Sequence, residues 1–158
     1  MTTQEPMEVQ TRNLFVGRTA TGKYDITLNG EKFNATKAGT FIGCLPPFGC
    51  LQEVSFTIPE EVLTIKHVIA SVPLHLPPGT YPVTNDATGA TASYSISRKT
   101  TDGGWYTTRY RAGEGYFTFS AAVEQTQHMK GHFEFVVMIE GLRQTLAGTF
   151  DIQEAAMP

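Results

Sequence analysis

The chain has 158 residues, the length of one ordinary domain, and its 41% hydrophobic content supplies enough apolar side chains for one core. Its formal net charge of −3 argues against general nucleic-acid binding, and no apolar run approaches the roughly 20 residues of a membrane-spanning helix. Threonine, glycine and aromatic residues are abundant, and these residue types favour strands and turns. The composition therefore predicts one all-β domain that binds no nucleic acid and has no integral membrane segment.

The two ends of the chain are polar. Residues 1–12 carry neither the apolar segment nor the small-residue cleavage site of a secretory signal, so no signal peptide is predicted in this chain. We expect 1–12 to be a disordered arm, 13–153 to form a single antiparallel β domain, and 154–158 to be a tail. As written, this pattern predicts a cytoplasmic protein, and the mature form of an exported protein stays open as the alternative.

Candidate strands follow one another at short intervals between turn signals, as is typical of antiparallel sandwiches and barrels. The Asn29-Gly30 pair predicts a two-residue hairpin turn. The apolar residues of 57–72 recur at helical spacing, but their β-branched character favours a strand. The predicted fold is an antiparallel β-barrel of the lipocalin-like kind or a β-sandwich, with at most one short helix near 58–71. The predicted strands are Leu14–Val16, Lys23–Leu28, Lys32–Thr36, Thr40–Gly43, Glu53–Ile58, Val72–Leu76, Thr80–Val83, Thr91–Arg98, Trp105–Ala112, Tyr116–Val123, Gly131–Ile139 and Gln144–Ile152.

Two cysteines, Cys44 and Cys50, flank a loop that contains two prolines and a glycine. Such a loop can bring the two sulfur atoms together. Three states stay open at this point: free buried thiols, a disulfide, and a metal or redox site. The metal alternative lacks the further ligands at the spacing that zinc sites use.

The last three predicted strands alternate apolar and polar residues, so their apolar sides can be aligned. A two-residue Gly141-Leu142 turn of type II′ would place Phe135 opposite Gly148 and Glu140 opposite Arg143. One face then gathers five aromatic rings that fill a small barrel and leave little cavity: Phe117, Phe119, Phe133, Phe135 and Phe150. The opposite face carries Val136 and Met138, which offer a surface for an oligomer.

The strands Thr91–Arg98 and Trp105–Ala112 can be aligned in the same way, with Tyr94 beside Tyr110 on one face and serines, threonine and arginines on the other. The segment 98–113 has four basic residues against one acidic residue, and it holds the single tryptophan. Arginine and aromatic side chains are enriched at binding hot spots, and arginine binds carboxylates and phosphates in a bidentate manner. The alternative is an ordinary solvated hairpin whose tryptophan caps the core. The candidate binding residues are Trp105, Arg109, Arg111, Arg98 and Tyr106.

The C-terminal half contains an ordered series of turn and core motifs: PPGTYPV (77–83), ATASYSI (90–96), GEGYFTF (113–119), KGHFEFVVMI (130–139) and LAGTFDI (146–152). This arrangement resembles small all-β domains of unknown function found in bacterial lipoproteins. The resemblance implies an antiparallel sandwich or a lipocalin-like barrel and no known activity, and it transfers no catalytic or binding residue. The chain departs from that pattern because it lacks a lipobox cysteine and a signal segment.

Catalytic and metal-binding motifs are weak in this sequence. His128 and His132 have a spacing that would suit a metal on a helix, but a strand reading separates them. No serine or cysteine has the sequence setting of an activated nucleophile, and no cofactor is predicted. The sequence therefore favours a non-enzymatic binding or interaction module that meets an anionic or sugar-like ligand or a protein partner. The alternative is a lipocalin-like carrier or an enzyme with a small internal pocket.

Overall fold

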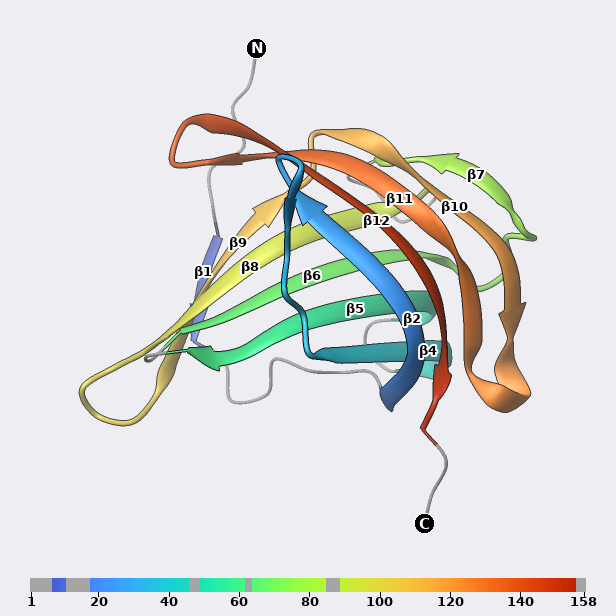
Figure 1. Ribbon diagram of the computed structural model, residues 1–158, viewed down its shortest axis with the longest axis horizontal. Helices are drawn as coiled ribbons and strands as arrows, with labels where there is room; N and C mark the ends of the chain where they lie inside the picture. The colour runs from blue at the N-terminus through green and yellow to red at the C-terminus, as the bar shows by residue number, and fades with distance from the viewer. Residues whose placement is uncertain (1–6, 11–17, 46–48, 62–63, 85–88, 156–158) are drawn as a thin grey trace.

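The computed structural model describes residues 7–10, 18–45, 49–61, 64–84 and 89–155, and these form one all-β unit (Figure 1). Every pairing between its strands is antiparallel, which confirms the predicted fold class. The strands are β1 (Met7–Gln10), β2 (Arg18–Leu28), β3 (Glu31–Lys32), β4 (Lys37–Leu45), β5 (Gly49–Glu61), β6 (Thr64–Pro73), β7 (Gly79–Pro82), β8 (Thr91–Lys99), β9 (Trp105–Arg111), β10 (Glu114–Val123), β11 (His128–Ile139) and β12 (Leu142–Glu154), and a short 3₁₀ turn, η1 (Glu124–Thr126), joins β10 to β11.

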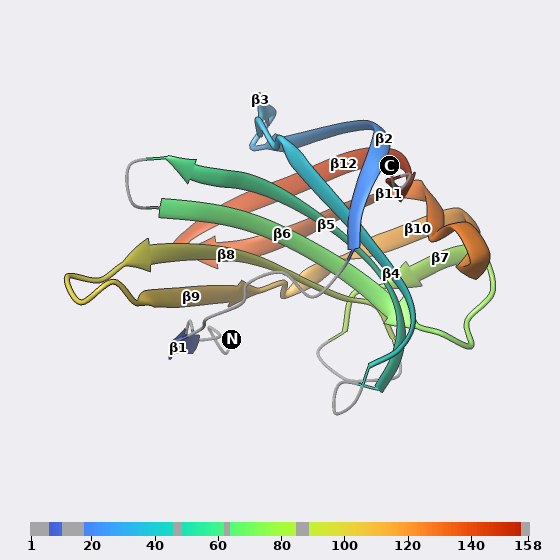
Figure 2. The same cartoon turned by 90° about the horizontal axis from the view of Figure 1, so that it is seen from below.

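The strands form a single sheet in the order β1-β9-β8-β6-β5-β4-β2-β12-β11-β10-β7, and β3 pairs with β2. This sheet curls strongly, so β5 comes to face β11 and β12 across the interior (Figures 1 and 2). The ring of Phe56 on β5 lies 6.1 Å from the ring of Phe133 on β11 and 6.1 Å from that of Phe150 on β12. The architecture is therefore barrel-like. In the residues that the structure describes, no helix has the length and apolar character to cross a bilayer.

The described residues of the ambiguous segment 57–72 belong to strands β5 and β6, not to a helix. Val68 and Val72 face the core, whereas Ile65 and Ile69 lie on the opposite face of β6. The helical spacing of these residues arises because both faces of β6 carry apolar side chains. The β-branched composition was the better guide in this segment.

The prediction of a disordered arm over 1–12 is wrong for Met7–Gln10. These residues form β1, which pairs with β9 in the register Met7 with Arg109. An edge strand offers unpaired backbone groups to any extended segment that reaches it, and a polar sequence does not prevent that pairing. The rest of the predicted arm and the predicted strand Leu14–Val16 lie outside the described residues.

The structure confirms the predicted alignment of β8 with β9 and the predicted hairpin turn at Asn29-Gly30. Tyr94 on β8 lies opposite Tyr110 on β9, and Ser95 lies opposite Arg109. Asn29 and Gly30 have φ angles of 53° and 79°, the left-handed values that a two-residue hairpin turn requires.

The predicted register between β11 and β12 is wrong by two residues. The turn consists of Glu140 and Gly141, with φ angles of 52° and 80°, which fits type I′ and not type II′. Phe133 therefore lies opposite Gly148, and Phe135 lies opposite Leu146. A shift of two residues keeps every side chain on its own face, so strand alternation alone cannot distinguish the two registers.

Gln127, at the end of the β10–β11 connection, completes the hydrogen bonding of β4. The main-chain N–H of Ile42 donates to Gln127 Oε1 at 2.7 Å, and Gln127 Nε2 donates to the carbonyl of Ile42 at 3.0 Å. This part of β4 lies beyond its pairing with β2, which ends at Thr40 opposite Arg18. The buried amide of Gln127 thus replaces a neighbouring strand.

The interior is filled by aromatic rings. All five predicted phenylalanines are at most 3% exposed: Phe117, Phe119, Phe133, Phe135 and Phe150. Contacts among these rings have centroid separations of 5.5–6.3 Å, which is the range of favourable aromatic packing.

Replacement of Phe135 by alanine should lower the free energy of unfolding by about 3–5 kcal/mol, because a fully buried ring is removed from a packed core. Val136→Ala on the opposite face of β11 is the matched control, and it should cost much less. Denaturant unfolding measures both variants. A midpoint for Phe135→Ala close to that of the wild type would show that this face of β11 is not the core.

Gln127→Gly should lower the free energy of unfolding by about 2–3 kcal/mol, because it leaves the N–H and carbonyl of Ile42 without partners. Glycine suits the φ angle of 52° at this position, so backbone strain does not contribute to the loss. Gln125→Ala, two residues earlier and exposed, is the control. Equal stability of the two variants would exclude the capping role of Gln127.

Candidate functional site

The residues predicted from the β8–β9 hairpin divide between the two faces of the sheet. Arg109, Arg111 and Trp105 lie on the face turned away from the core, with both arginines exposed and the tryptophan half-buried. Arg98 and Tyr106 lie opposite each other on the other face, and Tyr106 is 51% exposed. The structure therefore keeps the two arginines together and separates Arg98 and Tyr106 from them.

The face that carries the arginines is lined by hydroxyl side chains, and we refer to it as the hydroxyl face. It extends over β5, β6, β8 and β9, which lie side by side (Figure 2). On the other side of the same strands lie core residues such as Phe56, Val68 and Tyr94. Most of the hydroxyl side chains are 9% exposed or less, which is unusual for the outer surface of a sheet. They are Ser55, Thr57, Ser71, Ser93, Ser95, Ser97 and Thr107.

One row across the hydroxyl face joins Thr57, His67, Ser95 and Arg109, each opposite the next in register. Thr57 Oγ1 and His67 Nδ1 share a hydrogen bond at 2.6 Å. Burial, and to a smaller extent the positive charge of Arg109, lower the pKa of His67 to about 4. The imidazole is therefore neutral at neutral pH.

Glu53 lies on the same face, opposite Phe41 on β4 and Ser71 on β6. Burial raises the pKa of Glu53 to about 7, and the positive charge of Arg109 partly opposes this rise. In the register, Ser95 of β8 alone lies between Arg109 and His67, whereas both β8 and β6 lie between Arg109 and Glu53. Glu53 therefore gains or loses its charge close to neutral pH.

Ser55 carries the least satisfied polar atom of the hydroxyl face. Its side chain is 5% exposed, and its Oγ has no hydrogen-bond partner in the part of the chain that the structure describes. Leaving a buried hydroxyl without a partner costs about 1–3 kcal/mol. Such a group in a native fold calls for an explanation, and a ligand is one of them.

The predicted histidine pair does not form a metal site. His128 Nε2 lies 2.6 Å from an oxygen of Asp151, whereas His132 packs edge-on against the ring of Tyr116. Four residues along one strand separate the two histidines by roughly 13 Å. Within the described ranges, no group of three or more histidine, cysteine or acidic side chains is placed to hold a metal ion.

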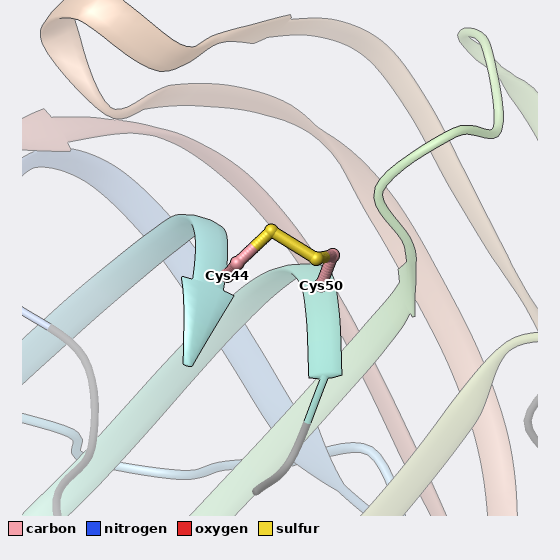
Figure 3. Close-up of a disulfide and its surroundings, with 2 residues drawn as sticks. All are labelled: Cys44 and Cys50. Carbon is pink, nitrogen blue, oxygen red and sulfur yellow. A yellow bond between two sulfur atoms is a disulfide. The ribbon is translucent and has the colours of Figure 1, made fainter. Parts of the chain in front are cut away.

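Of the three states left open for the cysteines, the structure has the disulfide. Cys44 at the end of β4 is bonded to Cys50 at the start of β5, opposite it in register (Figure 3). Both residues are exposed, so the alternative of buried thiols does not apply. The bond closes the β4–β5 hairpin at the end farther from His67 and Thr57.

A surface cleft of about 400 Å³ lies beside β2 and β3, outside the phenylalanine-filled interior. Ile26 and Phe33 form its apolar part, and Lys23 and Lys32 are its cations. Its other lining residues are Gly22, Tyr24 and Ala35. The surface predicted for an oligomer is elsewhere, on β11, where Val136 and Met138 are half-buried.

Comparison of the chain with protein-family models, curated proteins and solved structures gave no match. The candidate site therefore rests on its own residues. Sequence reasoning missed Glu53, Ser55 and His67, because their place beside Arg109 depends on the order of β5, β6, β8 and β9 in the sheet. The usable signal was the run of serines at alternate positions of 93–97, on the face that also carries the arginines.

The pKa of Glu53 predicts how stability depends on pH. A carboxyl whose pKa rises from 4.5 to about 7 on folding adds stability below pH 4.5, and this contribution is lost as the pH rises through 7. His67 acts in the opposite sense, because its lowered pKa removes stability as the pH falls from 6.5 to about 4. The two effects oppose each other in the acidic range.

Glu53→Gln removes only the first effect. The variant should be more stable than the wild type by about 2 kcal/mol at pH 8, and the difference should vanish near pH 4.5. Denaturant unfolding at both pH values measures this, with Glu31→Gln on exposed β3 as the control. A difference that does not change with pH would show that Glu53 is not buried as described.

Proposed function

We propose that the protein is a non-enzymatic binding module that holds an anionic ligand on the hydroxyl face, with Arg109 and Arg111 as its cationic contacts. The main support for this proposal is that the two guanidinium groups are exposed and have no ion-pair partner among the described residues. The two arginines are neighbours on the same face of β9.

The acidic groups that would have neutralised these arginines are engaged elsewhere. Glu114 forms an ion pair with Arg143, and Asp102 accepts hydrogen bonds from the Thr100 hydroxyl and the Gly104 N–H. Arginine without a local partner retains all its donors for a carboxylate or phosphate group. The adjacent serine hydroxyls add neutral donors of the kind that bind oxyanions or sugar hydroxyls.

The rival proposal is a carrier or an enzyme with an internal pocket. The packed phenylalanine interior supports the binding module, since aromatic rings occupy the space that an internal ligand would need. The surface cleft beside β2 and β3 favours the rival to a limited extent, because about 400 Å³ is enough for a small ligand. Its two lysines make the cleft a second place at which an anion could bind.

Arg109→Ala combined with Arg111→Ala should weaken anion binding at least tenfold in low salt, and by less at high ionic strength, where charges are screened. Stability should change by only about 0.5 kcal/mol, as for other exposed substitutions. Binding is measured by ¹H–¹⁵N NMR titration with sodium sulfate, sodium acetate and a sulfated disaccharide. Lys23→Ala combined with Lys32→Ala removes the same charge from the cleft and is the matched control.

The two double variants separate the proposals. Loss of binding in the arginine variant alone supports the hydroxyl face. Loss in the lysine variant alone places the ligand in the cleft and overturns the proposal. Equal losses in both variants would show that the anion responds only to the net charge of the protein.

A further inference from the structure

The β5 side of the hydroxyl face holds two polar groups that lower the stability of the fold. Ser55 Oγ is buried without a partner in the described part of the chain, and Glu53, two residues before it on the same face, is held in a desolvated position. Apolar side chains of similar size would pack there at less cost. Polar groups retained against such a cost are typical of binding sites.

We propose that Ser55 Oγ and the neutral carboxylic acid of Glu53 form an oxyanion subsite together with Arg109, and that the protein takes up a proton at Glu53 when the oxyanion binds. This inference rests on the proposed function, because it specifies the ligand chemistry of the same face. The ligand class is a compact oxyanion, carried as a carboxylate or as a tetrahedral sulfate or phosphate group.

The register gives the dimensions of this subsite. Ser55 lies opposite Ile69 on β6, which lies opposite Ser93 on β8, and Ser93 lies opposite Arg111 on β9. Arg109 occupies the next row, opposite Ser95. Three strand spacings separate β5 from β9, roughly 14 Å. The side chains between Arg109 and Ser55 are the small serines of β8 and, on β6, Ile69 and His67. In this proposal Arg109 extends across part of the span, and the oxyanion completes it by accepting a hydrogen bond from Ser55 Oγ.

Glu53 is surrounded mainly by neutral and cationic groups. On the two neighbouring strands, Glu53 lies opposite Phe41 of β4 and Ser71 of β6. Four residues farther along the same face, Lys37 of β4 and His67 of β6 lie on either side of Thr57. From β8 come Thr91 and Ser93, and from β9 come Arg109 and Arg111. Among the side chains that the structure describes on this face, Glu53 is the one carboxylate.

These surroundings couple binding of the oxyanion to protonation of Glu53. An oxyanion beside Arg109 repels an ionised Glu53, whereas a protonated Glu53 can donate a hydrogen bond to it. Because burial holds the pKa of Glu53 at about 7, protonation requires little free energy at neutral pH. His67, with a pKa of about 4, stays neutral over the same range and adds no second titration.

The test measures the affinity of the full chain for sulfate and for acetate between pH 6 and pH 8.5 at constant ionic strength. Both ions keep a constant charge over this range, so a pH dependence belongs to the protein. Wild-type affinity should increase about three- to tenfold from pH 8.5 to pH 6, which corresponds to a coupled pKa change of half a unit to one unit. The ion that binds more tightly distinguishes a tetrahedral group from a carboxylate.

Three variants locate the effect. Glu53→Gln should bind with an affinity that does not change with pH, and Ser55→Ala should bind several-fold more weakly at every pH while keeping or gaining stability. Ser120→Ala, an exposed serine on β10, should behave as the wild type.

If binding depends on Arg109 and Arg111 but is independent of pH and unchanged in Ser55→Ala, the subsite is wrong and the proposed function stands. If neither ion binds the wild-type protein at any pH, both proposals are overturned.

Discussion

Strand alternation in β5, β6 and β8 determines both the packing of this molecule and its chemistry. Along β5, Phe56 enters the aromatic interior while Ser55 and Thr57 face the other way, and β8 repeats the pattern with Tyr94 between Ser93 and Ser95. One sheet thus separates an apolar layer from a layer of buried hydroxyls. A register error of one residue in any of these strands would exchange the two layers, so the hydrophobic core also fixes the hydroxyl face.

The protonation of the titratable groups on the hydroxyl face depends on burial and on the positive charge of Arg109. Burial favours the neutral forms of Glu53 and His67, and the charge of Arg109 lowers the pKa of both. Near neutral pH the face therefore carries a fixed positive charge, a neutral imidazole and a carboxyl that changes its charge readily. Such a surface is suited to an anion whose binding is coupled to a proton.

Local patterns in the sequence were sufficient for much of the fold. The β8–β9 register and the side of the sheet taken by Arg109 follow from alternation and from the pairing of Tyr94 with Tyr110. The β11–β12 register does not, because Glu140-Gly141 and Gly141-Leu142 are both plausible turns and the faces agree in either case. In the observed register Phe133 lies opposite Gly148, where a Cβ would lie only 2.9 Å from its ring.

The sequence predicted the arginines of the candidate site but not its glutamate and histidine, because these groups come together only through the order of the strands. Arg109 stands out in the sequence as part of a basic aromatic hairpin, but Glu53 and His67 are distant from it along the chain. They join it through the lateral order β9-β8-β6-β5, which is a long-range property of the sheet. Likewise, the Cys44–Cys50 loop could be recognised from its prolines and glycine, whereas its oxidation state could not.

The most direct test of this account is the pKa of the Glu53 carboxyl, measured by ¹³C NMR in wild-type protein with and without sulfate. We expect a pKa near 7 in the free protein, and this pKa should rise further when sulfate is added. An ordinary value near 4.5 that sulfate does not change would contradict the account, because neither the buried carboxyl nor its coupling to an anion would then exist.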